Sequence, residues 1–190
     1  MARLTRRALP LATVELARYL IGKRLVHAHR RGLVAGRIVE TEAYPPGDPT
    51  GYFRSGLTTA NAPLFAVRGT AYVRMVYGTC FNLNMAAEEV GTGASVLIRA
   101  LEPEAGIDLM SALRPASKLR DLARGPGRLC AALDIGRDLS GEDLTTSRVL
   151  WLESGRTPGI TVSTRIGLSR DQHRRLRFLE LGSPFVSFPP

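Results

Sequence analysis

The segment 37–44 reads Arg-Ile-Val-Glu-Thr-Glu-Ala-Tyr and carries two carboxylates and an aromatic ring at alternate positions. Side chains two apart on a strand share a face, so one side is expected to carry Ile38, Glu40, Glu42 and Tyr44. Buried carboxylates need a partner or a raised pKa, which makes this face unsuited to an ordinary core. It suits a pocket where a carboxylate activates water beside a stacking ring. The alternative is an edge strand that exposes both glutamates to solvent.

The charge balance indicates the class of partner. The 190 residues include 26 Lys or Arg against 17 Asp or Glu, a formal net charge of +9. Lys23 and Lys118 are the only lysines, so the other 24 basic residues are arginines. Arginine forks bind phosphates and stack on bases, which favours a nucleic-acid partner. A compositional bias toward arginine and alanine would give the same count, so the charge alone does not decide.

The cysteine and hydropathy patterns bear on metal binding, membrane insertion and the cellular compartment. Cys80 and Cys130 lie far apart, with no Cys-x-x-Cys and no histidine spacing typical of zinc. The basic N-terminus lacks a continuous apolar stretch because Thr13, Glu15 and Arg18 interrupt it, unlike a signal peptide. No run approaches the roughly 18–20 apolar residues of a membrane span. These patterns predict a soluble, cytoplasmic protein in a reducing compartment, without a metal site.

The sequence pattern predicts one α/β (α+β) domain over residues 1–190, with a mainly antiparallel sheet. Periodicity predicts helices over 11–21, 104–114 and 128–133. Strands are predicted over 24–29, 33–44, 70–77, 80–86, 94–101, 149–152, 161–168 and 176–180. Residues 45–62 should be loop, with a short helix near its end.

Six segments, in order, resemble the alkyladenine (3-methyladenine) DNA glycosylase family. They are 37–44, the hairpin ending in Tyr77-Gly78, 96–103, 125–130, 165–167, and 177–178 with 182–187. Together they cover roughly residues 14–188. The resemblance implies a single compact domain with a curved antiparallel sheet, flanked by helices, whose β-hairpin intercalates into DNA from the minor groove.

The resemblance also implies roles for the residues of the reacting site. Glu42 matches the residue that deprotonates the water attacking C1′, and Tyr44 matches the ring that stacks on the flipped base. Asn84 matches a residue that discriminates among purines. Arg99 matches one that helps hold the reacting site, although alone it would be interpreted as a solvent-facing arginine at a strand end.

The hairpin turn matches the DNA-binding wedge of the family. An enzyme that reaches the sugar bond must flip the nucleotide out of the duplex and fill the gap. Tyr77, followed by Gly78, supplies a ring at the hairpin tip for that purpose. The alternative is that Tyr77 packs on the core as a strand-end aromatic.

Two substrate-binding positions depart from the family pattern. Tyr52 stands at or next to the position of a family histidine, after Asp48-Pro49. Arg74 replaces a second aromatic three residues before the wedge tyrosine. A guanidinium stacks on a base but brings a fixed charge. A charged wall would disfavour cationic 3- or 7-methylpurines more than neutral hypoxanthine or ethenoadenine.

Lysine usage indicates the type of glycosylase. A bifunctional enzyme forms a Schiff base through an amine, and neither Lys23 nor Lys118 falls in a matching segment. The sequence therefore predicts a monofunctional DNA-repair glycosylase, monomeric and free of cofactors, acting on damaged purines in double-stranded DNA. One alternative is a family member that binds distorted DNA but has lost turnover. The other is a different enzyme or an RNA-binding protein on a similar small sheet fold.

Overall fold

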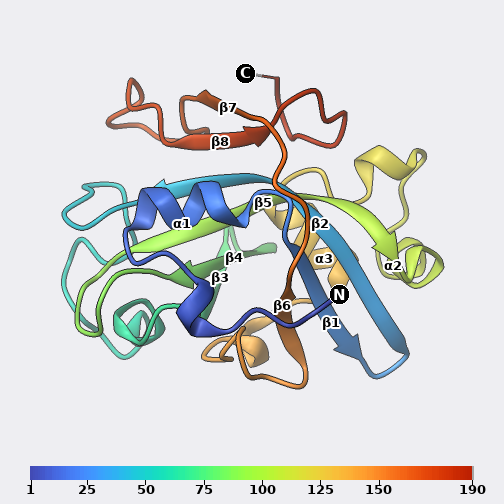
Figure 1. The fold of residues 1–190 in the computed structure, drawn as a ribbon, viewed down its shortest axis with the longest axis horizontal. Coiled ribbons are helices and arrows are strands. Elements are labelled where there is room, and N and C mark those ends of the chain that lie inside the picture. Colours follow the sequence, from blue (N-terminus) through green and yellow to red (C-terminus); the bar gives the residue numbers. More distant parts are fainter. Residues whose placement is uncertain (190) are drawn as a thin grey trace.

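The structure is a computed structural model that describes residues 1–189. One antiparallel sheet dominates it, with the strand order β3-β4-β5-β2-β1-β6, and β8 pairs with both β2 and β7 (Figure 1). The strands are β1 (Arg24–His29), β2 (Gly32–Tyr44), β3 (Ala71–Val76), β4 (Cys80–Ala86), β5 (Ser95–Ala105), β6 (Leu150–Glu153), β7 (Ile160–Ser163) and β8 (Arg177–Glu180). The helices are α1 (Thr13–Leu20), α2 (Ile107–Leu113) and α3 (Pro126–Leu133), with 3₁₀ turns η1 (Arg6–Ala8), η2 (Ala62–Phe65), η3 (Leu119–Asp121) and η4 (Arg137–Leu139). The predicted mixed fold with a curved antiparallel sheet is confirmed.

The long strand β2 lies at the centre of the sheet. Its first half pairs with β1, residues 40–42 pair with β8, and β5 pairs along its length. Glu40 and Glu42 are both 0% exposed. The edge-strand alternative is therefore wrong, because β2 has neighbours on both sides and the two carboxylates are enclosed.

The alternation along β2 is broken between Ile38 and Thr41. The pairing with β5 shifts register on both sides of Glu40, as at a β-bulge. Ile38 consequently packs in the main core with Ala43, on the face covered by α1, where the Thr41 hydroxyl donates to the Ala17 carbonyl at 2.9 Å. The prediction that Ile38 shares the face of Glu42 was wrong, because the register shift moves it to the opposite face.

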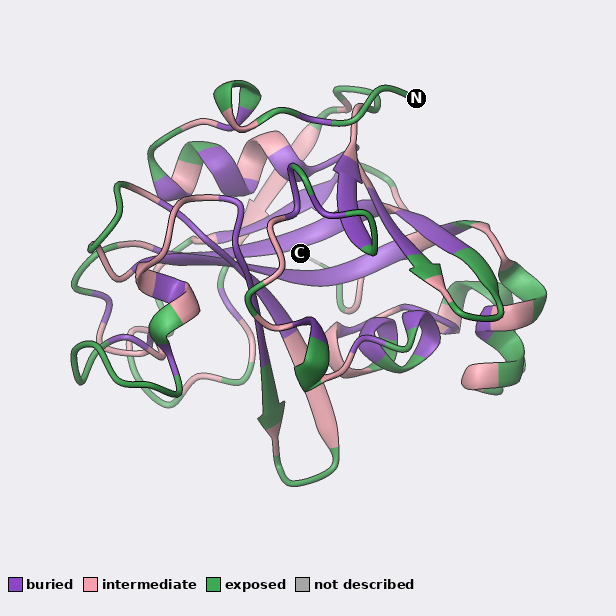
Figure 2. Cartoon of the chain, turned by 90° about the horizontal axis from the view of Figure 1, so that it is seen from below, coloured by how far each residue is buried: buried purple, intermediate pink, exposed green. Residues whose placement is uncertain are grey.

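The helices pack against the curved sheet, and burial is concentrated on the central strands (Figure 2). Helix α1 buries Leu16, Ala17 and Leu20. Its first N–H groups lack intrahelical partners, and the Glu88 carboxylate accepts from the Thr13 N–H at 2.7 Å and from its hydroxyl at 2.6 Å. Among the described helices, none is long and apolar enough to cross a bilayer.

Three predicted boundaries need correction. Strand β5 continues to Ala105, so α2 begins at Ile107 rather than at 104. Gly106 separates them with φ +69°, where an added Cβ would lie 2.3 Å from the Leu33 carbonyl oxygen. Strand β7 ends at Ser163 rather than at 168, because Arg165 turns inward and becomes buried. The short helix expected near the end of 45–62 is η2, which begins at residue 62.

Candidate active site

A cavity of about 260 Å³ is lined by residues of β2, β4 and β5, by the tip of the β3–β4 hairpin and by residues 166–168. We call it the aromatic cavity because Tyr44, Tyr52 and Tyr77 lie in its wall. Asn84 from β4 and Arg99 from β5 also line it, so five predicted site residues meet in one place. Its volume is below the roughly 300–1,000 Å³ of pockets for drug-sized ligands, which suits a single flat heterocycle.

Glu42 lies directly behind this wall. One carboxylate oxygen accepts from the Ile166 N–H at 2.8 Å and lies 3.2 Å from Arg99 Nη1. The other accepts from the Tyr44 hydroxyl at 2.8 Å. Burial raises the pKa of Glu42, while Arg99, the Ile166 N–H and the Tyr44 hydroxyl oppose that rise. The site thus holds a carboxylate whose proton affinity is increased and whose position is fixed from three sides.

Arg99 bridges the two glutamates of β2. Its Nε donates to Glu40 at 3.0 Å while Nη1 contacts Glu42. Burial alone would lower the pKa of Arg99, but the charges of Glu42 and Glu40 raise it. The predicted alternative of a solvent-facing strand-end arginine is wrong, because Arg99 is buried.

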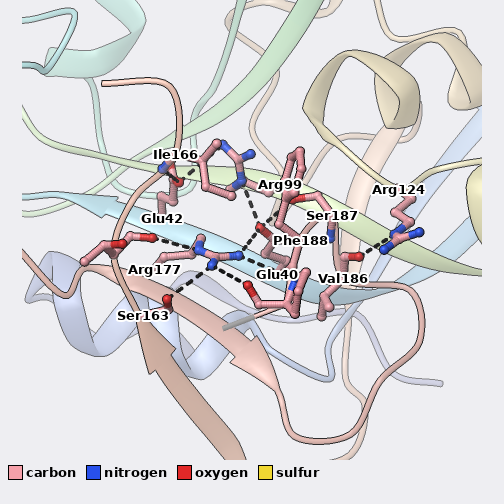
Figure 3. Close-up of polar contacts among 12 residues, drawn as sticks. Glu40, Glu42, Arg99, Arg124, Ser163, Ile166, Arg177, Val186, Ser187 and Phe188 are labelled. Carbon is pink, nitrogen blue, oxygen red and sulfur yellow. Dashed lines mark hydrogen bonds and ion pairs between the residues drawn. The ribbon is translucent and has the colours of Figure 1, made fainter. Parts of the chain in front are cut away.

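Glu40 ties the same cluster to the C-terminal segment (Figure 3). It accepts from Arg177 Nη1 at 3.2 Å and from the Ser187 hydroxyl at 2.8 Å. Arg177 also donates to the carbonyls of Phe188 and Pro189, both at 3.1 Å. Sequence reasoning assigned no role to the contacts of Glu40 with Arg177 and Ser187, although both residues lie in the last of the six matching segments.

Tyr44 is supported from behind by a second ion-pair cluster. The Arg165 guanidinium carbon lies 4.6 Å from the centroid of the Tyr44 ring, and Arg165 Nη1 donates to Asp48 at 2.8 Å. Burial would raise the pKa of Asp48, but hydrogen bonds from Thr50 and Arg165 lower it overall. Burial and the neighbouring Glu42 raise the pKa of Tyr44, so its hydroxyl stays protonated and donating. Sequence reasoning gave Asp48 and Arg165 no role, although Arg165 begins the matching segment 165–167 and Asp48 lies in the loop after 37–44.

Asn84 presents an unused donor to the cavity. The residue is 1% exposed and, within residues 1–189, its Nδ2 has no hydrogen-bond partner. A buried polar group without a partner is costly, on the order of 1–3 kcal/mol. The cavity therefore favours a ligand with an acceptor opposite Asn84.

Arg74 and Tyr52 form a pair on the hairpin side. The Arg74 guanidinium carbon lies 4.3 Å from the centroid of the Tyr52 ring, and Tyr52 contacts Tyr72 edge-on at 6.2 Å between centroids. Tyr52 lines the cavity, whereas within the described residues the lining does not include Arg74. Arg74 thus stacks on the outer side of Tyr52, and the guanidinium is separated from the cavity by that ring.

The hairpin tip carries Tyr77 and Gly78 in a left-handed turn. Val76 pairs with Cys80 across the turn, and the φ angles of Tyr77 and Gly78 are +52° and +68°. A non-glycine residue at positive φ is uncommon and strained. Tyr77 is 89% exposed, so the alternative that it packs on the core is wrong.

The curved sheet and the buried carboxylate–arginine pair behind an aromatic cavity define a small α+β protein with an enzyme-like site. In the part of the chain that the structure describes, no three or more His, Cys, Asp or Glu side chains are grouped to hold a metal ion. The available chemistry is that of an acid, a base and a fixed positive charge.

Comparison with known proteins identifies the family. The family model described as Methylpurine-DNA glycosylase matches residues 8–184. A Paraburkholderia phytofirmans protein is 52% identical over 189 residues, covering 98% of this chain and 88% of the relative. A Mesorhizobium japonicum protein is 52% identical over 188 residues, covering 98% and 90%. Both are provisionally named 3-methyladenine DNA glycosylases. The chain belongs to the methylpurine-DNA glycosylase family, and the predicted resemblance is confirmed.

Proposed function

We propose that this protein is a monofunctional DNA glycosylase that hydrolyses the N-glycosidic bond of damaged purines in duplex DNA. The family supports the glycosylase activity, since the relatives are named for it. The observation that carries the mechanism is the buried pair of Glu42 and Arg99 directly behind the aromatic cavity. Its substrates are hypoxanthine, ethenoadenine, 3-methyladenine and 7-methylguanine, released during base excision repair.

In the first step the flipped base enters the aromatic cavity. Tyr44 offers a ring face for stacking, with Arg165 holding the opposite face. The free Nδ2 of Asn84 donates to an acceptor on the purine, and this contact discriminates among purines because an unmatched base leaves the donor buried and unpaired.

In the second step Glu42 removes a proton from a water molecule as its oxygen attacks C1′ of the sugar. A carboxylate has about four acceptor sites, and three are used by Ile166, Arg99 and Tyr44. One site is left for the water. The C1′–N bond breaks with its electron pair leaving on the base, and the strand retains an abasic sugar. Burial raises the pKa of Glu42 and strengthens it as a base, while the charge of Arg99 opposes that rise and favours the carboxylate.

The hairpin tip acts as the wedge. Flipping a nucleotide leaves a gap in the stack, and an exposed ring on a tight turn fills it. Tyr77 has the required exposure, and the left-handed turn at Gly78 projects it from the hairpin.

The lysines support monofunctional chemistry. Lys23 is buried under Tyr19, with its Nζ 3.1 Å from the Arg156 carbonyl oxygen, and Lys118 precedes η3. Within the described residues, neither lines the aromatic cavity. We therefore take water to be the nucleophile in this proposal. We further propose that residues 1–190 form one domain that acts as a monomer on chromosomal DNA in the cytoplasm.

The test is base release from defined duplexes. The protein is incubated with duplexes containing each of the four lesions, and abasic sites are cleaved with alkali. We expect strand breaks only after alkali, and far fewer with Glu42→Gln in the same incubation time. Breaks before alkali would contradict the monofunctional mechanism. Tight lesion binding without release would favour the alternative of a DNA-binding family member that has lost turnover.

A further inference from the structure

Strand β4 contributes two amide side chains to the aromatic cavity, and the proposed mechanism uses only one of them. Asn82 and Asn84 are two residues apart, so they share a face of the strand, and both line the cavity. Asn84 is buried, whereas Asn82 is partly exposed and lies nearer the hairpin turn, paired with Arg74 of β3. A second polar side chain in the wall of a base-sized cavity can take part in selecting the base.

The sheet places Asn82 beside the reacting groups. Asn84 pairs with Leu97 of β5, and Leu97 pairs with Glu42 of β2. Two residues further in the same direction along β4 and β5, the same face carries Asn82 and Arg99, and both line the cavity. A base that is held in the cavity while its sugar faces Glu42 therefore lies next to the Asn82 amide.

Tyr52 orients the Asn82 amide. Burial raises the pKa of the Tyr52 hydroxyl, while the charge of Arg74 and a hydrogen bond with Asn82 act against that rise. A hydrogen bond lowers the pKa of a phenol when it is donated to the phenol oxygen, so the amide N–H of Asn82 faces Tyr52. The carbonyl oxygen of Asn82 and the O–H of Tyr52 are then left for a ligand. Together they offer one acceptor and one donor to the cavity.

The four proposed substrates differ in what they present to such a pair. Hypoxanthine and 7-methylguanine carry a C6 carbonyl next to an N1–H, and 3-methyladenine carries an amino group at C6 next to N1. In ethenoadenine the additional ring joins N1 to N6, so no N–H remains on this edge of the base. An acceptor that faces this edge then has no partner, which weakens binding of that base.

We propose that Asn82, oriented by Tyr52, selects purines that carry an N–H at position 1 or 6 and so favours hypoxanthine over ethenoadenine. This inference rests on the proposed function, because it takes the ligand of the aromatic cavity to be a flipped purine. The Asn82 carbonyl accepts from the N–H of the base, and the Tyr52 hydroxyl donates to the neighbouring carbonyl oxygen or ring nitrogen. Asn82 thus adds a second contact to the one made by Asn84.

The experiment compares two neutral lesions, so that charge does not enter the comparison. Single-turnover release of hypoxanthine and of ethenoadenine is measured from otherwise identical duplexes. Asn82→Leu removes the acceptor, Asn82→Asp keeps one, and Tyr52→Phe removes the hydroxyl that orients the amide. Thr79→Val is the matched control, since Thr79 is a polar residue of the same hairpin that lies outside the cavity lining among residues 1–189.

We expect Asn82→Leu to lower the ratio of hypoxanthine to ethenoadenine release by about tenfold, as for loss of one buried hydrogen bond. Ethenoadenine release itself should be retained or should rise, because the unmatched acceptor is gone. Tyr52→Phe should lower the ratio by about twofold to fivefold, since the amide loses its orientation but keeps its acceptor. Asn82→Asp should keep the ratio near that of the wild type.

Binding to a duplex that carries a tetrahydrofuran abasic analogue, measured by fluorescence anisotropy, should not change in Asn82→Leu, because that duplex presents no base. Three results would overturn the proposal: an unchanged ratio in Asn82→Leu, an equal loss in Asn82→Asp or Thr79→Val, or weaker binding of Asn82→Leu to the abasic-analogue duplex. Failure of the wild type to release either base would instead contradict the proposed function. The selection by Asn82 is then measured as the ratio of affinities for the two lesion duplexes.

Discussion

The base of the aromatic cavity and the tip of the hairpin are built in opposite ways. Behind the cavity, Glu40, Glu42, Arg99 and Arg177 form a continuous set of buried ion pairs. At the tip, Tyr77 is almost fully exposed and its backbone is strained. Chemistry on a sugar bond needs charges that are held before the substrate arrives. Opening a base stack needs a side chain that the protein itself leaves free.

Glu42→Gln should produce the largest effect and separates chemistry from binding. The amide keeps the side-chain shape but cannot accept a proton from water. We expect base release to fall by roughly 10²–10⁴-fold, as is typical for loss of a general base. Binding to the abasic-analogue duplex should be retained or tightened, since a negative charge near DNA is removed. Single-turnover rates and anisotropy on the same preparation measure both quantities. A wild-type rate of base release in Glu42→Gln would assign the role of general base to another residue.

Tyr77→Ala should affect the opening of the base stack and not the chemistry at the sugar bond. Base release from duplex DNA should fall by about tenfold or more, because unstacking costs a few kcal/mol per step and the ring no longer fills the gap. Release from single strands should change much less. Met75→Ala is the matched control, since Met75 is also an exposed apolar side chain of the hairpin. Equal losses on both substrates would mean that Tyr77 acts through the cavity wall and not by filling the stack.

The sequence predicted one of these two regions better than the other. The hairpin is local, so alternation on both sides of a three-residue turn was enough to place Tyr77 at its tip. The paired glutamates were recognised as unusual, but their partners come from distant segments. Ser187 reaches Glu40 from 147 positions away, and Ile166 reaches Glu42 from 124. The register shift that sends Ile38 to the core also has no local signal.

Arg74→Tyr tests the charge beside the cavity. The expected effect is smaller than for direct contact with the base, because Tyr52 lies between Arg74 and the cavity. Like charges about 8 Å apart cost roughly 0.5 kcal/mol in water and about 2 kcal/mol at intermediate dielectric. Because Arg74 is exposed, we expect the ratio of 3-methyladenine to hypoxanthine release to rise about twofold to fivefold. Arg54→Tyr is the control, since Arg54 is also exposed, and it should leave this ratio of release unchanged.

A rise in that ratio of more than about tenfold would mean that the guanidinium moves onto the base when DNA binds. An unchanged ratio would mean that solvent screens the charge completely.

Glu40→Gln should produce the smallest effect on rate and tests whether the two glutamates act as a pair. Glu42 faces Arg99 from β5 and the Tyr44 hydroxyl and Glu40 from its own strand, while Arg177 from β8 contacts Glu40. The negative charge of Glu40 raises the pKa of Glu42. In the proposed mechanism base release requires ionised Glu42, so we expect activity to fall as the pH drops through that pKa.

Removing the charge of Glu40 lowers the pKa of Glu42, so the acidic limb of the pH–rate profile should move to lower pH. Arg99 would then pair with Glu42 as its one remaining carboxylate partner, which also lowers the pKa of Glu42. Ser187→Ala is the control: it removes a hydrogen bond to Glu40 but no charge, and its acidic limb should stay in place. Glu40→Gln should also lower the melting temperature, because buried Arg177 loses its charged partner. A lower melting temperature with an unmoved acidic limb would show that Glu40 anchors the C-terminal segment without tuning the base.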